Sequence, residues 1–456
     1  MARDVSDATP IGARDELVAW IAAGEKPSDD WRLGTEHEKI PFYRAGHAPV
    51  PYEGEAGIRA LLDGLRAETG WEPILDHNNI IGLFDAEGGG AISLEPGGQF
   101  ELSGAPVATI HETAEEFARH MDEVKRVAGP LDMGFLTLGM SPKWSRAETP
   151  FMPKRRYAIM RAYMPKVGSR GLDMMFRTAT VQVNLDFASE ADMVRKMRVS
   201  LALQPVATAL FANSPFTEGR PNGFLSMRSE IWRDTDNQRA GMLPRAFDDG
   251  FGYESYVDWA LDVPMYFVKR DDTYHDVAGA SFRDLLAGQL EQLPGEVATR
   301  SDWANHVSTL FPEVRLKRYI EMRGADVGPP ERIAALSAFW VGLLYDEAAL
   351  DAAWDLVKGW SAEDRERLRA DVPRLGLNAQ VAGRTLRDVA RDVLAFSRSG
   401  LSRRARLDAG GRDETHFLDP LDAIVARGRT AAEELLDKYR GPWGGSVEPA
   451  FEECVF

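Results

Sequence analysis

A tight turn between two short apolar segments constrains the fold of this chain more than any other feature of its sequence. The segment 94–104 reads Leu-Glu-Pro-Gly-Gly-Gln-Phe-Glu-Leu-Ser-Gly, in which Pro-Gly-Gly is a turn signal and the flanking residues alternate between apolar and polar. This pattern predicts a β-hairpin. Side chains two apart on a strand point to the same face, so we expect Gln99 and Glu101 to share a face close to Glu95.

Two carboxylates and an amide on one face of an apolar hairpin indicate a partner for these groups. A hard divalent cation is the natural partner, because it takes oxygen ligands. The alternative is a solvated face of an antiparallel sheet. The hairpin alone does not decide between the two interpretations.

Three further segments, 32–42, 180–187 and 313–326, repeat the pattern of a strand with one polar face. Their polar residues are, in chain order, Glu36 and Glu38; Gln182, Asn184 and Asp186; Glu321 and Arg323. His37 is expected to point away from the first of these faces. Taken one at a time, such faces are typical of solvated sheet surfaces and surface ion pairs.

Basic residues crowd the segment 150–178 of this strongly acidic protein. A solvated loop is one interpretation. The interleaved Met, Tyr and Phe residues favour a partly buried electropositive patch that binds an acidic ligand. Arginine can hold a carboxylate or phosphoryl group through two parallel hydrogen bonds, and the candidates for this role are Arg156, Arg177, Arg228 and Arg323.

The net charge of −17 argues against a nucleic-acid or anionic-membrane partner, because both favour a basic surface. The single cysteine, Cys454, excludes an intramolecular disulfide and a multi-cysteine zinc site. The segment 1–7 lacks the apolar core of a signal peptide, and its acidic residues argue against a transit peptide. We therefore predict a cytoplasmic protein.

The paired prolines at 329–330 mark a change in organisation. Before them, apolar strands alternate with helices; after them, the periodicity is helical almost to the end. This pattern predicts an α/β catalytic body over residues 1–326 and a helical C-terminal portion over 327–456, packed together as one structural unit.

If the four polar faces lie side by side, one face of a sheet is lined with carboxylates and amides, which is costly unless metal ions neutralise it. Mg²⁺ is the expected metal, held by carboxylates, waters and substrate phosphates. The chain has no P-loop motif and no dinucleotide-binding motif. The residues thus predict a Mg²⁺-dependent, ATP-using enzyme with an acidic small-molecule substrate.

Several motifs, in order along the chain, resemble the glutamate–cysteine ligases of plants and proteobacteria. They are the segments 34–39, 94–104, 152–165, 174–187, 213–229 and 315–326, and the resemblance extends to Trp443 and 451–453. The resemblance implies an α/β (α+β) fold with a curved antiparallel catalytic sheet like that of glutamine synthetase, flanked by helices. It also implies ligation of the glutamate γ-carboxylate to the cysteine amine through a γ-glutamyl phosphate, the first step of glutathione biosynthesis.

The resemblance further implies roles for single residues. Mg²⁺ ligands would be Glu36, Glu38, Glu95, Gln99, Glu101 and Glu321. Arg156 and Arg228 would grip glutamate, Gln182 and Asn184 would lie near the same face, and Arg323, with Glu321, would lie at the transferring phosphate.

The single cysteine bears on redox regulation and oligomeric state, and two alternative functions stay open. Plant members carry cysteine pairs that form regulatory disulfides; this chain cannot, so we expect a monomer or weak homodimer without a redox switch. Ligation of glutamate to another amine and a non-catalytic metal-binding protein are the alternatives. The arginines argue against the second, because a metal buffer has no use for Arg156 and Arg228.

Overall fold

The computed structural model describes residues 7–456, so the segment 1–6, which contributed to the cytoplasmic prediction, lies outside the described residues. A nine-stranded sheet in the order β14-β15-β7-β1-β5-β4-β3-β2, with β6 also paired to β1, forms the centre of the molecule. Its pairings are all antiparallel, which confirms the predicted sheet. The strands are β1 (Leu33–Tyr43), β2 (Glu72–Asp76), β3 (Asn79–Phe84), β4 (Ala91–Leu94), β5 (Phe100–Ser103), β6 (Met133–Leu136), β7 (Thr180–Leu185), β14 (Val314–Leu316) and β15 (Ile320–Asp326).

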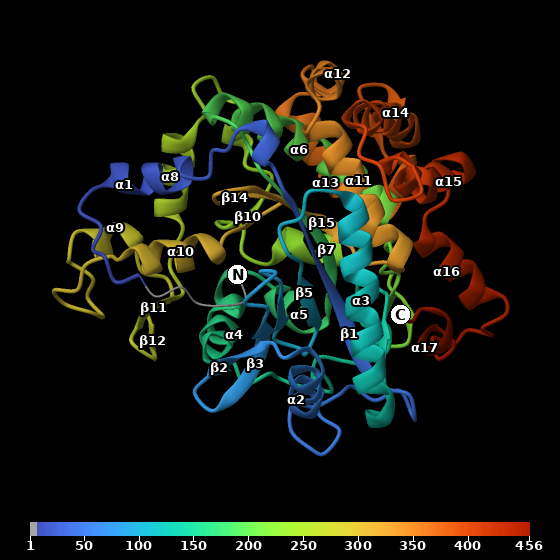
Figure 1. Cartoon of the computed structure of the whole chain (residues 1–456), viewed down its shortest axis with the longest axis horizontal. Helices are drawn as coiled ribbons and strands as arrows, with labels where there is room; N and C mark the ends of the chain where they lie inside the picture. The colour runs from blue at the N-terminus through green and yellow to red at the C-terminus, as the bar shows by residue number, and fades with distance from the viewer. Residues whose placement is uncertain (1–6) are drawn as a thin grey trace.

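Helices surround this sheet (Figure 1). They are α1 (Arg14–Ala22), α2 (Ile58–Thr69), α3 (Ile110–Ala128), α4 (Arg155–Val167), α5 (Gly171–Arg177), α6 (Glu190–Phe211), α7 (Met227–Ile231), α8 (Tyr253–Asp262), α9 (Phe282–Leu286), α10 (Arg300–Ser308), α11 (Pro330–Leu344), α12 (Glu347–Val357), α13 (Ala362–Leu375), α14 (Leu386–Arg404), α15 (Asp419–Arg427), α16 (Ala431–Arg440) and α17 (Ala450–Glu453). Short two-stranded ribbons complete the fold: β8 (Phe216–Thr217) with β9 (Arg220–Pro221), β10 (Ala240–Gly241) with β13 (Phe311–Pro312), β11 (Phe267–Arg270) with β12 (Thr273–Asp276), and β16 (Gln380–Val381) with β17 (Arg384–Thr385).

Local sequence sets the ends and the buried faces of the helices. The Thr109 side chain accepts the N–H of Glu112, whose carboxylate returns a bond to the Thr109 N–H, so a capping box starts α3. Gly70 ends α2 in the left-handed conformation, with φ of 74°. The buried stripe of α2 consists of Ile58, Leu61, Leu62 and Leu65.

The back of the sheet is covered by α3, α6 and α11, which contact β1, β7 and β15. The Thr35 and Ser337 hydroxyls hydrogen-bond at 2.7 Å between β1 and α11, and Val183 and Leu336 belong to the same apolar cluster. Each fully buried aliphatic side chain of this kind contributes about 1.5–3 kcal/mol. The apolar core therefore extends across residue 326, and the division of the chain at that position stays a prediction.

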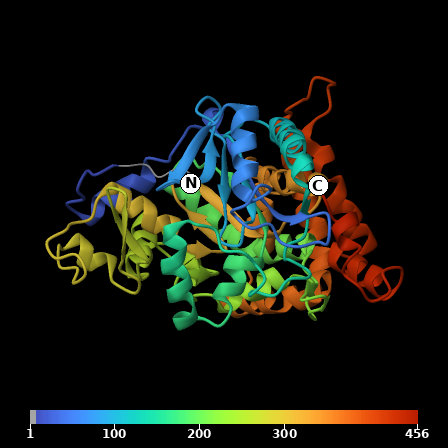
Figure 2. The same cartoon turned by 90° about the horizontal axis from the view of Figure 1, so that it is seen from below.

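The C-terminal helices lie on one side of the sheet and α1, α8, α9 and α10 on the other, where the region around α9 and β12 projects outward (Figures 1 and 2). Of the helices in the described part of the chain, none is by itself long and apolar enough to cross a membrane. Helices α11 and α12, which are bent by 90° at the break between them, reach the length and apolar composition of a membrane span only when the two are taken together.

The segment 313–326 differs from the single strand that its alternation predicts. It forms a hairpin, β14 and β15, in which the Lys317 N–H donates to the Tyr319 carbonyl at 2.9 Å and Arg315 pairs with Glu321. The turn keeps the polar side chains on one face, so the alternation continues unbroken through it.

Candidate active site

A cavity that is partly open to solvent lies on the face of the sheet opposite α3 and α11. Strands β1, β4, β5, β7, β14 and β15 supply its floor, and α4 and the segment after α10 supply its walls. The charged and amide residues that line it are Glu36, Glu38, Glu95, Glu101, Lys154, Arg156, Gln182, Arg315, Lys317 and Arg323. Five separate stretches of sequence are thus brought to one cavity.

The acidic side of the cavity is formed by β1 and β5, where Glu38 lies opposite Glu101 in the antiparallel register. Two serines support Glu101: Ser93 donates to it at 3.0 Å and Ser103 at 2.8 Å. The Thr180 backbone N–H donates to Glu38 at 3.0 Å.

The crowding of these carboxylates changes their acidity. Burial, together with the charges of Glu95 and Glu101, raises the pKa of Glu38 well above its ordinary value. Burial, Glu321 and Glu101 raise the pKa of Glu36 in the same way. Burial and the neighbouring carboxylates therefore both oppose ionisation of Glu36 and Glu38.

The donor set fits a hard divalent cation in kind, because oxygen atoms of four carboxylates face one cavity. Within residues 7–456, however, no three or more His, Cys, Asp or Glu side chains are arranged closely enough to hold a metal ion. The predicted Mg²⁺ ligands of β1 and β5 therefore share a cavity without converging on one point.

The basic side of the cavity is built around Glu321, whose side chain is fully buried. Arg315 donates to both Glu321 oxygens at 2.7 Å, Lys317 lies 3.2 Å away and Arg323 2.5 Å away. Burial alone would raise the pKa of Glu321, but Arg315, Lys317 and Arg323 together hold it well below its ordinary value. One carboxylate thus anchors three cations that line the cavity.

The two predicted amides join the acidic and basic sides. Gln182 accepts a hydrogen bond from Arg323 at 2.6 Å and lies opposite Glu36 in the register of β7 and β1. Asn184 donates to Glu36 at 2.8 Å and lies opposite Glu321. The strands that carry the four polar faces therefore lie side by side, which is the condition that the sequence analysis set for one shared polar face.

Helix α4 brings Arg156 to the cavity wall, with its guanidinium 5.5 Å from the centre of the Tyr157 ring. The Tyr157 hydroxyl donates to the Leu94 carbonyl at 2.7 Å and lies 3.4 Å from Glu95. Burial, with the charge of Glu95, raises the pKa of Tyr157 well above its ordinary value. The basic segment is thus helical and buried on its cavity side.

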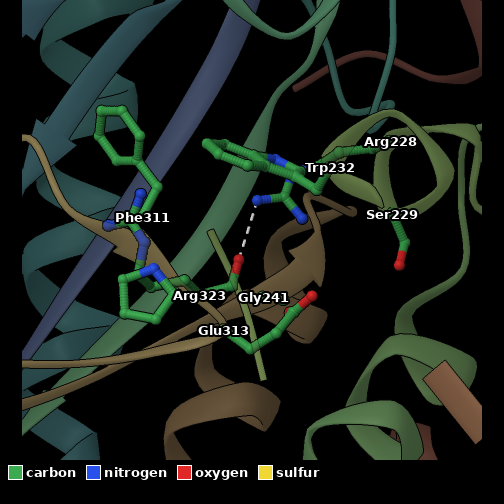
Figure 3. A pocket seen from close by; sticks show the side chains of 9 residues that line it. Arg228, Ser229, Trp232, Gly241, Phe311, Glu313 and Arg323 are labelled. Atoms are coloured by element: carbon green, nitrogen blue, oxygen red, sulfur yellow. Dashed lines mark hydrogen bonds between the residues drawn. The ribbon is translucent and has the colours of Figure 1, made fainter. Parts of the chain in front are cut away.

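Arg228 lines a small recess that shares Phe311 and Arg323 with the main cavity (Figure 3). Its guanidinium donates to the Arg323 carbonyl at 2.8 Å. Glu313 faces the same recess, and among the described residues the buried Trp232 indole N–H has no hydrogen-bond partner. A positive group, a carboxylate and a donor therefore surround one small space.

Gln99 and Arg177 do not line the cavity, and Asn184 reaches it only through its hydrogen bond to Glu36. The Gln99 amide accepts from the Gly97 N–H at 2.9 Å and donates to the Thr178 carbonyl at 2.8 Å, which fixes the hairpin turn. Arg177 pairs with Asp173 at 2.6 Å and Glu218 at 2.8 Å. The side chains of Gln99 and Arg177 are therefore engaged in hydrogen bonds and ion pairs within the protein.

Sequence reasoning overlooked several lining residues, chiefly Arg315, Lys317, Lys154 and Tyr157. A signal existed for the first two, because Arg315 and Lys317 have the same parity as Glu321 and Arg323. No comparable signal selects the residues of α4, since its N-terminus is placed by a contact between the Arg155 N–H and the distant Asp76 at 2.7 Å.

The sequence of this chain is similar to a known protein family and to several plant enzymes. The model of glutamate-cysteine ligase family 2 (GCS2) matches residues 32–453. The chloroplastic glutamate–cysteine ligase of Nicotiana tabacum is 56% identical over 443 residues, covering 97% of this chain and 83% of that protein. Its counterpart from Arabidopsis thaliana is 55% identical over 449 residues, covering 98% and 84%.

These relatives also correct one prediction. The cytoplasmic location inferred from the N-terminal residues is wrong, because these relatives are named chloroplastic. The inference rested on the composition of a few residues, which is weak evidence about subcellular localisation.

A solved structure supports the fold. The glutamate–cysteine ligase of Francisella tularensis, in complex with AMP, matches with a TM-score of 0.54 at 12% identity, covering 90% of this chain and 85% of that one. At this identity the match concerns the fold alone. The family model and the plant relatives carry the assignment: the chain belongs to glutamate–cysteine ligase family 2, of the plant type, and is therefore a ligase.

Proposed function

We propose that this ligase joins the γ-carboxylate of glutamate to the amine of cysteine with the use of ATP, through γ-glutamyl phosphate, as the first step of glutathione biosynthesis. The observation that carries the proposal is an acidic side and a basic side facing one cavity, with Glu38 and Glu101 on the first and Arg315, Lys317 and Arg323 on the second. Phosphoryl transfer depends mainly on positioning and charge neutralisation.

The chemistry needs two steps. A γ-carboxylate oxygen of glutamate takes the terminal phosphoryl group of ATP, and ADP leaves. The cysteine nitrogen then attacks the carbonyl carbon of the phosphorylated γ-carboxyl group, phosphate leaves with that oxygen, and the nitrogen loses a proton. A free carboxylate is a poor electrophile, so the first step makes the second possible.

The basic side fits the phosphate groups. Arg315, Lys317 and Arg323 are held toward the cavity by Glu321 beneath them, so their charges need no reorganisation when phosphate arrives. We therefore assign Glu321 the role of counter-ion to these three residues. This replaces the role of metal ligand that the family resemblance implies.

Because no three of these carboxylates converge, Mg²⁺ would be held by no more than two of Glu36, Glu38, Glu95 and Glu101, together with phosphate oxygens of the substrate. When bound, the ion would neutralise phosphate charge and polarise the phosphoryl oxygens. Gln99 is left out of this set because its amide is engaged by the backbone. Burial raises the pKa of Glu36 and of Glu38, and the charge of Glu101 raises each further, so a cation bound beside them would favour their ionised forms.

The polar groups around the recess of Arg228 match, in charge and in hydrogen-bonding type, the α-amino-acid end of glutamate. Arg228 can hold a carboxylate through two parallel hydrogen bonds, and the Trp232 N–H and Glu313 lie in the same recess. Arg156, which lines the main cavity, would hold the other end of the substrate.

The test uses glutamate labelled with ¹⁸O in its γ-carboxylate. Together with ATP, Mg²⁺ and cysteine it should yield ADP and phosphate carrying one labelled oxygen. Unlabelled phosphate would contradict the acyl-phosphate route. Equal ADP release with several unrelated amines in place of cysteine would support the alternative, a ligase for another amine.

A further inference from the structure

The carboxylate of Asp326, the last residue of β15, is 1% exposed and accepts three hydrogen bonds. One oxygen accepts from the Asn213 backbone N–H at 2.9 Å and from the Ser214 hydroxyl at 2.7 Å. The other accepts from the Ser226 hydroxyl at 2.8 Å. An ionised carboxylate only accepts, so both serine hydroxyl protons must point toward Asp326.

The same two hydroxyls hold the start of α7, the helix that carries Arg228. Ser214 Oγ accepts the Arg228 backbone N–H at 3.1 Å. Ser226 is the N-cap of α7, and its Oγ accepts the Ser229 N–H at 3.2 Å. Because Asp326 takes the proton of each hydroxyl, the lone pairs are turned toward the helix.

The other end of Arg228 is tied to the same strand. Its guanidinium donates to the carbonyl of Arg323, three residues before Asp326, and only 3% of the residue is exposed. Burial lowers the pKa of Arg228, and the negative charge of Asp326 is the strongest influence that opposes this effect. Strand β15 thus fixes both the backbone and the side chain of Arg228.

We propose that Asp326 is a positioning residue for Arg228: through Ser214 and Ser226 it fixes the first turn of α7, and with it the orientation in which the guanidinium meets glutamate. This inference rests on the proposed role of Arg228 in binding glutamate. Asp326 itself would touch no substrate. Its effect should therefore appear in glutamate binding before it appears in turnover.

The test is Asp326→Asn, which keeps the shape but replaces an acceptor oxygen by a donor NH₂, so that one hydroxyl must reverse. The apparent KM for glutamate should rise about tenfold, the equivalent of one hydrogen bond, with kcat and the KM for ATP within about twofold of wild type. Ser214→Ala, which removes one link without touching the acid, should raise the glutamate KM in the same direction if Asp326→Asn does not fold.

Glu414→Gln is the matched control. Glu414 is likewise a buried carboxylate that accepts a backbone N–H, that of Ile110 at 2.7 Å, and pairs with Arg404, but it lies outside the cavity. It should lower the melting temperature without changing the glutamate KM.

An unchanged glutamate KM in both Asp326→Asn and Ser214→Ala would overturn the positioning role. A fall in kcat accompanied by an equal rise in the KM for every substrate would overturn it as well. Arg228→Lys separates this outcome from failure of the proposed function. If Arg228→Lys also leaves the glutamate KM unchanged, the assignment of Arg228 itself is wrong.

Discussion

Glu38 of β1 lies directly opposite Glu101 of β5, and both side chains line the cavity. Like charges in this position destabilise a pair of strands. Burial and the charges of Glu95 and Glu101 raise the pKa of Glu38, so folding opposes its ionisation. This pair of carboxylates therefore lowers the stability of the folded protein when both are ionised.

Glu38→Gln should be more stable than the wild type at pH 8 without Mg²⁺, by about 1–2 kcal/mol. A carboxyl whose pKa is raised in the folded state binds more protons there than in the unfolded chain. The wild type therefore loses stability as the pH rises from the ordinary value of 4.5 through the folded pKa, and the variant does not. Urea unfolding at pH 5 and pH 8 should show a difference that grows with pH.

Mg²⁺ provides the second part of this test. It should raise the melting temperature of the wild type, because a ligand that binds the folded state stabilises it, and should do so much less in Glu38→Gln. Glu68→Gln, a change at an exposed ion pair with Arg126, is the control and should alter neither behaviour. A variant less stable than wild type at pH 8 would contradict the view that these carboxylates are crowded.

Arg228→Lys should raise the apparent KM for glutamate by roughly ten- to hundredfold, because lysine cannot reproduce two parallel hydrogen bonds to a carboxylate. The Mg²⁺ titration should stay unchanged. Arg365→Lys is the control, since Arg365 is buried against the Phe247 ring outside the cavity. Steady-state titrations of glutamate and Mg²⁺ decide the matter; a normal glutamate titration would mean that another arginine holds the substrate.

Glu321→Gln should lower the free energy of unfolding by about 3–5 kcal/mol, because it leaves Arg315, Lys317 and Arg323 crowded without their counter-ion. The KM for ATP should rise, while the Mg²⁺ concentration that gives half-maximal activity should not change. Adding Arg315→Met should restore part of the stability. A shifted Mg²⁺ requirement with normal stability would instead identify Glu321 as a metal ligand.

Cys454 should be inert in the folded protein. It is 8% exposed, and burial raises the pKa of its thiol to about 12, so almost no thiolate forms at neutral pH. A thiol reagent should label it only after unfolding, and pre-treatment with dithiothreitol should leave activity unchanged. A dimer on a non-reducing gel, or activation by the reductant, would refute this expectation.

Strict alternation made part of the site predictable. In β1 and β7 it identified which side chains share a face, so Glu36, Glu38, Gln182 and Asn184 could be expected on one side of a sheet. Alternation also survived the unpredicted turn between Arg315 and Glu321, because a hairpin keeps directly paired residues on the same face.

Residues outside regular strands were not predictable in this way. Gln99 precedes β5 and follows Gly98, whose φ of 87° turns the chain, so the parity of β5 does not apply to it. The recess of Arg228 depends on contacts with β13 and β15, which are distant in sequence. No local pattern encodes such contacts.

The strand order has a consequence for synthesis of the chain. The acidic strands β1 and β5 neighbour each other and are made early, whereas the basic strands β14 and β15 follow after residue 313 and complete the sheet beyond β7. A chain emerging from the ribosome therefore exposes crowded carboxylates long before their cationic neighbours exist, in a protein whose folding depends on contacts between distant segments. A polypeptide truncated before β14 would keep the acidic side of the cavity and lack the groups proposed to receive ATP.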